Sequence, residues 1–67
     1  MLDVVQKVNG NLVIQTTWAD DNKAGAKKSF HDICSLLYGD KDTTSGVVAL
    51  LDDNLDVVDG CKVFIEK

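Results

Sequence analysis

The segment 52–56 holds the residues whose types and spacing come nearest to a known binding chemistry. Its first, third and fifth residues are Asp52, Asn54 and Asp56, the spacing with which oxygen ligands occur in a calcium-binding loop. Such a loop needs glycine at its sixth position and a bidentate glutamate at its twelfth, where this chain has Val57 and Val63. The pattern therefore favours an ordinary turn between two strands, and we expect no metal site here.

The side chains that are able to bind zinc or act as a nucleophile pair are His31, Cys34 and Cys61. A structural zinc site needs four ligands in paired spacings, which these three do not form. His31 and Cys34 lie one helical turn apart with no third group to orient them, so Cys34 is better interpreted as a small core side chain. The chain also lacks a glycine-rich phosphate loop. We expect no catalytic residue, no metal and no cofactor, and we predict that the protein is not an enzyme.

The charge of the chain limits its partners. Its 67 residues include 11 acids and 7 basic residues, all of them lysine, for a net charge of −4. Arginine is the usual reader of phosphate and guanine, and phosphate neutralisation supplies most nucleic-acid affinity. We therefore expect no direct nucleic-acid partner and no membrane partner. Because no basic and apolar leader opens the chain, we expect a cytoplasmic protein with both cysteines reduced.

The acids are concentrated in one part of the sequence. Between residues 40 and 59 there are six aspartates and one lysine, for a charge of −5. One interpretation is that solvated loops hold these aspartates, since aspartate favours turns and caps. The other is a negative surface at one end of the molecule that meets a basic partner.

Hydrophobic periodicity predicts one domain over residues 1–67. Residues 2–8 and 11–18 form two strands joined by Asn9-Gly10, a strong hairpin turn sequence, with Val8 facing Asn11 and Val5 facing Ile14. Asp20, Asp21 and Asn22 are candidate N-caps for a helix at 21–38 that Gly39 ends in the left-handed conformation. Its apolar stripe contains Ala26, Phe30, Ile33 and Leu37, widened by Cys34 and Leu36. Residues 46–51 form an interior strand covered on both faces, and 57–65 form the last strand, with a possible bulge at Gly60.

The predicted fold class is α+β, in the order β-β-α-β-β: a four-stranded antiparallel sheet with one helix packed on one face. Both faces of the first hairpin are apolar. One carries Val5, Leu12, Ile14 and Trp18, and the other carries Leu2, Val4, Val8 and Val13. One helix covers only one face, so we expect the uncovered set to form an interaction surface. The candidate residues of that surface and of the acidic end are Leu2, Val4, Val8, Val13, Tyr38, Asp52, Asp53, Asp56 and Asp59.

Residues 18–37 carry the pattern W-x-D-x5-A-x3-F-H-x-x-C-x-x-L, followed by the apolar run 47–52 and by Asp56-Val57-Val58 with Gly60. This pattern resembles a group of small uncharacterised acidic proteins encoded in phages and mobile elements of Gram-positive gut bacteria. The resemblance implies that genomic setting rather than a reaction, and it carries over no catalytic residue.

Three functions follow as hypotheses. The first is a non-catalytic protein-interaction module that self-associates as a homodimer, with a host or phage protein as a possible further partner. The second is an acidic inhibitor, of the anti-defence or nucleic-acid-mimic type, that blocks a basic site on a host enzyme. The third is a small enzyme or ligand binder assembled at an oligomer interface. The absence of a catalytic constellation and the two-faced apolar sheet favour the first.

Overall fold

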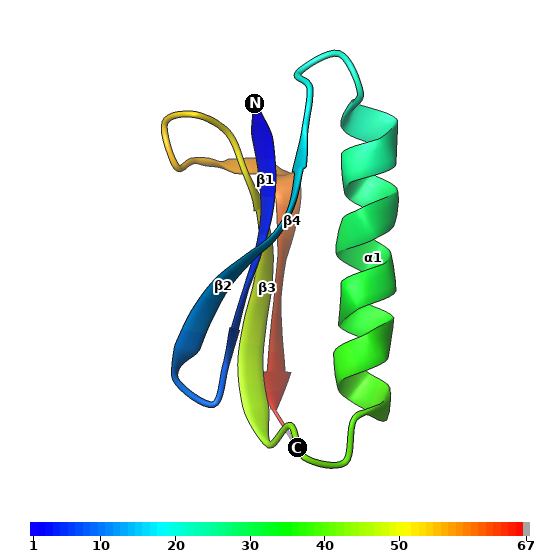
Figure 1. Ribbon diagram of the computed structural model, residues 1–67, viewed down its shortest axis with the longest axis vertical. Coiled ribbons are helices and arrows are strands. Elements are labelled where there is room, and N and C mark those ends of the chain that lie inside the picture. The colour runs from blue at the N-terminus through cyan, green and yellow to red at the C-terminus, as the bar shows by residue number, and fades with distance from the viewer. Residues whose placement is uncertain (67) are drawn as a thin grey trace.

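The computed structural model describes residues 1–66, which form a four-stranded antiparallel sheet with one helix against it (Figure 1). The elements are β1 (Leu2–Val8), β2 (Asn11–Trp18), α1 (Lys23–Gly39), β3 (Ser45–Leu51) and β4 (Val57–Glu66). The predicted α+β fold and the order of its elements are confirmed.

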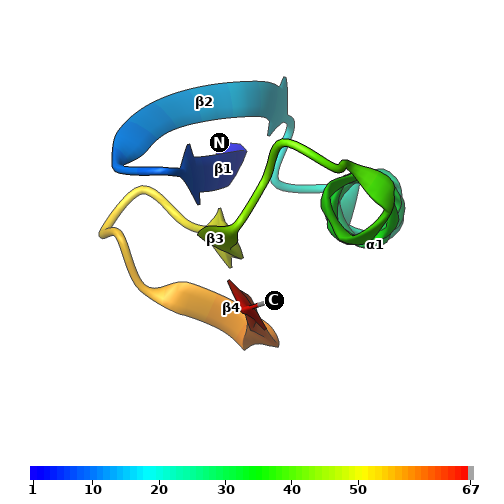
Figure 2. The same ribbon diagram turned by 90° about the horizontal axis from the view of Figure 1, so that it is seen from below.

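The strands lie in the order β2-β1-β3-β4, and each neighbouring pair is antiparallel. β3 is therefore an interior strand, as predicted. Within the described residues α1 is the only element that packs on the sheet, and it lies on one side (Figure 2). Within residues 1–66, α1 covers one face of residues 46–51, so the described chain does not itself provide the cover that was expected on both faces.

The first hairpin has the predicted turn and register. Asn9 and Gly10 have φ values of 50° and 91°, the left-handed values that the two central residues of a type I′ turn require. Val8 pairs with Asn11, and Val5 pairs with Ile14. The pairing at this end of the hairpin is therefore the one that a two-residue turn at Asn9-Gly10 predicts.

A β-bulge alters the other end of the same hairpin. Val4 pairs with Thr16 while Val5 pairs with Ile14, which leaves Gln15 as an extra residue in β2. Because side chains alternate between faces, one extra residue reverses the faces of everything beyond it. Trp18 therefore packs against the core rather than beside Ile14, and the expectation that these two residues share a face is wrong.

The helix begins and ends for identifiable reasons. The Asn22 side-chain oxygen accepts a hydrogen bond from the Gly25 backbone N–H at 3.2 Å, which confirms one of the predicted N-caps. At the other end, the Asp40 backbone N–H donates to the Leu37 carbonyl at 3.3 Å. Gly39 lies within the last turn without a positive φ, so the predicted left-handed glycine cap is wrong.

The core lies between α1 and the sheet face that it covers. The predicted helical stripe is buried, except that Leu36 is 66% exposed and does not widen it. From the sheet, Val4, Val48 and Leu50 are fully buried against it. Within the described chain, no helix has the length and apolar character needed to cross a membrane.

Candidate interaction face

The sheet face turned away from α1 is covered by no other element of residues 1–66 (Figure 2). Alternate residues of a strand share a face. Since Val4, Val48, Leu50 and Ile65 are buried on the helix side, the residues between them lie on the other side. We call this side the open face. Its members are Asp3, Val5, Lys7, Leu12, Ile14, Thr17, Val47, Ala49, Leu51, Val57, Lys62, Phe64 and Glu66.

Three large apolar side chains of the open face project into solvent. Leu12 is 68% exposed, Ile14 is 62% exposed and Phe64 is 71% exposed. Between them, Val5 and Val47 are half-buried, and Ala49 is buried by its neighbours in the sheet. Water thus contacts a nearly continuous apolar surface that crosses all four strands.

The charges of the open face balance, although the charges of the chain do not. Asp3 and Glu66 are negative, and Lys7 and Lys62 are positive, so the face has no net charge in a chain of −4. The Lys62 ammonium lies 5.2 Å from the centre of the Phe64 ring, a cation–π contact. Asp3 accepts a hydrogen bond from the Thr17 hydroxyl at 3.1 Å. Among residues 1–66, Lys7 forms no ion pair.

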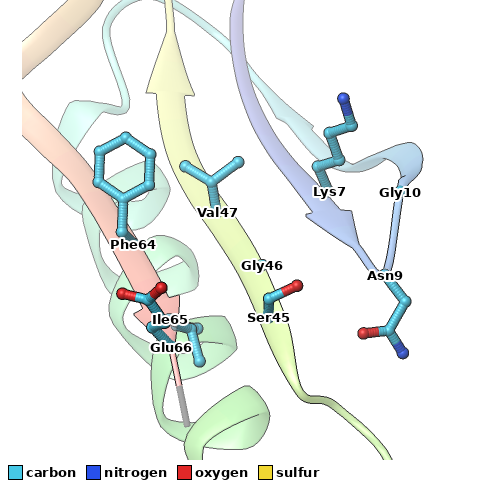
Figure 3. Close-up of a pocket in the computed structure, with 9 residues that line it drawn as sticks. All are labelled: Lys7, Asn9, Gly10, Ser45, Gly46, Val47, Phe64, Ile65 and Glu66. Atoms are coloured by element: carbon cyan, nitrogen blue, oxygen red, sulfur yellow. The ribbon is translucent and has the colours of Figure 1, made fainter.

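A hollow marks one end of the open face. Lys7, Val47 and Phe64 lie on three neighbouring strands around it (Figure 3). Its volume is about 340 Å³, and it opens widely to solvent. The backbone of Gly46 also lines the hollow. The shape and the apolar rim suit a protruding side chain of another protein better than an enclosed small ligand.

The predicted interaction residues of the first hairpin belong to the opposite face. Leu2 is 5% exposed and Val4 is 0% exposed, and Val8 packs against the same core. Leu2 and Val4 are not available to a partner and Val8 is half-buried under the helix, so their assignment to one exposed interaction surface is wrong. The reason is the pairing of β1 with β3, which places Val4 beside Leu50 under the helix. Val13 shares that face but lies on the edge strand β2, where it stays 46% exposed.

The other predicted residues lie away from the open face. Tyr38 is 56% exposed near the end of α1. Asp52 accepts hydrogen bonds from the backbone N–H groups of Asn54 and Asp56 at 2.8 and 3.1 Å, which confirms the turn interpretation of this segment. Asp53 pairs with the N-terminal ammonium at 3.0 Å, and the hydrogen bonds of that ammonium to Asp20 and to Asp53 raise its pKa.

Asp59 has a structural partner on the helix. Its carboxylate lies 2.9 Å from the Lys27 ammonium and 3.3 Å from the Lys23 ammonium, and these two lysines lower its pKa. Asp59 and Gly60 have positive φ values of 50° and 70°, and the strand pairing is irregular there, which confirms the predicted bulge. The bulge directs Asp59 toward α1 rather than toward a partner.

The acidic segment of the sequence does not form one surface. Asp40 and Asp42 lie in the loop after α1, at the opposite end of the molecule from the loop between β3 and β4 (Figure 1). The expectation that residues 40–59 together make one end of the molecule negative is therefore wrong, because these residues lie at two opposite ends. The negative end that does exist combines two loops and consists of Asp20, Asp21, Asp52, Asp53 and Asp56.

The potential nucleophiles and metal ligands are dispersed or buried. Cys34 and Cys61 are free thiols at 8% and 9% exposure, and burial raises the pKa of Cys34. His31 is exposed on α1, with its ring 5.1 Å from the Phe30 ring in an edge-to-face contact. Within the described chain, no three His, Cys, Asp or Glu side chains are grouped as a metal site requires.

The open face contains residues that sequence reasoning did not select. The sequence correctly predicts that Val5, Leu12 and Ile14 share one face of the hairpin, but it does not indicate that the helix covers the other face. Phe64 and Lys7 were not selected at all, although each occupies a period-two position beside the apolar residues of its strand. Knowledge of the β1–β3 pairing was needed to place them together. Comparison of this chain with protein-family models, curated proteins and solved structures finds no match.

Proposed function

We propose that this protein is a non-catalytic interaction module that associates with a second copy of itself through the open face. The observation that carries the proposal is the exposure of Leu12, Ile14 and Phe64 on one uncovered side of the sheet. Contiguous apolar surfaces of this kind mark association sites, since soluble monomers rarely leave them in water. Removing that surface from water is the driving force of the association.

The charge and the size of the open face support a second copy as the occupant. Two copies of a −4 chain repel each other overall, but the open face itself is neutral. Four strands at a spacing of about 4.8 Å and seven residues at about 3.4 Å give a face of roughly 450 Å² in projection. The accessible area of a corrugated face is larger, and a standard interface buries about 800 Å² per partner. The open face is thus large enough for a weak dimer, which fits an association that depends on protein concentration.

Light scattering after size-exclusion chromatography tests the proposal. At about 100 μM the wild type is expected at twice its 7.3 kDa mass, with dissociation on dilution. Leu12→Glu places a charge in the interface and should give a monomer. Leu36→Glu is the matched control, because Leu36 is equally exposed, at 66%, but lies on α1. A wild type that stays monomeric at this concentration, with native circular dichroism, would refute self-association.

A second candidate function is inhibition of a basic site on another enzyme. It is favoured by the five aspartates that two loops bring to one end of the molecule. Such an inhibitor would suit an accessory protein of a phage or mobile element, the setting expected from the pattern of residues 18–37, with a host enzyme that binds nucleic acid as its target.

An inhibition assay separates this function from the first. The protein would be titrated against a panel of nucleases from Gram-positive bacteria, with DNA cleavage as the readout. Asp21→Asn with Asp56→Asn should relieve inhibition, and Asp32→Asn, on the exposed side of α1, should not. Equal inhibition by all three proteins would show that the acidic end is not the inhibitory surface.

A further inference from the structure

The positions of the charged residues on the open face limit the orientations in which two copies are able to pack together. In the central strand β1, the three residues of that face are Asp3, Val5 and Lys7. Val5 thus lies midway between an acid and a base, each about 6.8 Å away along the strand. Lys7 has no ion-pair partner among residues 1–66, and the only partner of Asp3 there is a hydroxyl group.

Strand register places Val5 in the middle row of the face. Val5 pairs with Ile14 on one side and with Ala49 on the other, and Ala49 pairs with Lys62. The row on the Asp3 side continues through Leu51 and Val57. The row on the Lys7 side continues through Val47 and Phe64. The face is therefore a grid whose two outer rows carry opposite charges in β1.

We propose that two copies pack open face to open face about a twofold axis that follows the row Ile14–Val5–Ala49, so that Asp3 of each copy pairs with Lys7 of the other. This inference rests on the proposed self-association and adds its geometry. Rotation about that axis exchanges the two outer rows and keeps β1 over β1 of the second copy. It places Asp3 over Lys7, Leu51 over Val47 and Val57 over Phe64, twice each in the dimer.

The alternative twofold axis fits the charges less well. An axis parallel to the strands would exchange β1 with β3, and so would place Asp3 over Leu51 and Lys7 over Val47. Each charge would then be desolvated against an aliphatic side chain without a partner, which is costly. The perpendicular axis leaves one like-charged contact, between the two Lys62 side chains. Lys62 belongs to the edge strand β4 and is exposed, so its long side chain is able to extend into solvent.

Two sheets related by this axis would pack in the aligned arrangement that is common for face-to-face sheets. Aligned sheets cross at about 30°, so residues within one row of the axis remain close to their opposites. Asp3 and Lys7 lie within one row of it, in the central strand. Leu51 and Val57 of the second copy would also lie over the hollow at the end of the open face, which Lys7, Val47 and Phe64 line (Figure 3).

Charge exchange between the two positions tests the inference. Asp3→Lys places lysine over lysine twice, and Lys7→Asp places aspartate over aspartate twice. Each variant alone should weaken the dimer by about tenfold or more, because like charges are brought together in a desolvated interface. An equimolar mixture of the two variants should recover association as a heterodimer, because every contact is then between a lysine and an aspartate. The double variant with both changes should recover a homodimer.

Sedimentation equilibrium is the measurement, with circular dichroism to confirm that each variant is folded. Asp32→Lys is the control for net charge, because it makes the same change as Asp3→Lys on the exposed side of α1. Equal affinities of all variants, with Leu12→Glu still dissociating the wild-type dimer, would overturn the axis and leave the open-face dimer intact. A monomeric wild type would overturn both. Association of the equimolar mixture at near wild-type affinity, while each variant alone associates weakly, supports the proposed axis.

Discussion

Replacement of Phe30 by alanine is the sharpest test of the core. Phe30 is 2% exposed and is the largest side chain that α1 buries. Burying an aromatic side chain removes about 150–250 Å² from water, worth roughly 4–6 kcal/mol at 25 cal/mol per Å² as an upper bound. Measured Phe→Ala substitutions in cores cost about 3–5 kcal/mol. A single core in a domain this short supplies about 3–5 kcal/mol in total, so the Phe30→Ala variant should be largely unfolded at 25 °C.

Urea denaturation followed by circular dichroism measures this effect, and the chain contains its own control. Phe64→Ala makes the same chemical change at a position that is 71% exposed, so at low micromolar concentration it should change the unfolding midpoint little. The concentration matters because Phe64 belongs to the proposed dimer interface. The reasoning would be refuted if Phe30→Ala kept the wild-type urea midpoint while Phe64→Ala lowered it. That result would mean that Phe64, and not Phe30, is the buried residue.

Three further perturbations test the cap, an ion pair and the thiols. Asn22→Ala should lower the free energy of unfolding by about 1 kcal/mol, because the Gly25 N–H loses its acceptor, and Asn22→Asp should retain it, as urea midpoints would show. Asp59→Asn should lower the melting temperature at neutral pH. Because Lys27 and Lys23 depress the pKa of Asp59 below 3.8 in the folded state, that difference should vanish as the pH falls through the depressed value; a constant difference down to strong acid would contradict it. Cys34 and Cys61 should react slowly with an aromatic disulfide reagent in the native protein and promptly in denaturant, because both are buried; prompt native labelling would show that the core is open.

The features that were predictable from the sequence depend on residues close together in the chain. Asn9-Gly10 specifies a turn with two positive φ angles, and the register near it follows from two residues. The stripe from Ala26 to Leu37 similarly requires only the period of a helix. Asn22 caps α1 through a hydrogen bond to a residue three positions away. In each case the interaction that decides the structure is local.

The choice of the covered sheet face was not predictable in the same way. Both faces of the hairpin are apolar, so periodicity alone does not distinguish them. The distinction arises when β1 pairs with β3, which joins Val4 to Leu50 and creates one contiguous surface for Phe30. The Gln15 bulge adds Trp18 to that surface. Both events depend on contacts between distant parts of the chain.

The candidate site has the same dependence on distant contacts. Asp59 was expected on the acidic surface, but the bulge at Asp59 and Gly60 turns it toward Lys23 and Lys27, which lie more than 30 positions earlier. The negative end similarly needs the 19–22 loop beside the 52–56 loop, an arrangement that no run of charges in the sequence indicates. A charge count by segment therefore selects the wrong residues for the negative end.

The dimensions of the helix explain why the apolar residues exceed what this chain can cover. α1 has 17 residues and is about 26 Å long but only about 10 Å wide, whereas four strands span roughly 19 Å. One helix thus protects about half the width of one face, which is why Val13, on the covered face but in edge strand β2, stays 46% exposed. The opposite face receives no cover from residues 1–66 and still carries Leu12, Ile14 and Phe64. A sheet face that only contacts solvent would be expected to carry polar residues at these positions. In the central strand β1, Asp3 and Lys7 are the charged exceptions on this apolar face. Their opposite charges on either side of Val5 would favour the binding of a second copy in one orientation and disfavour the other orientations.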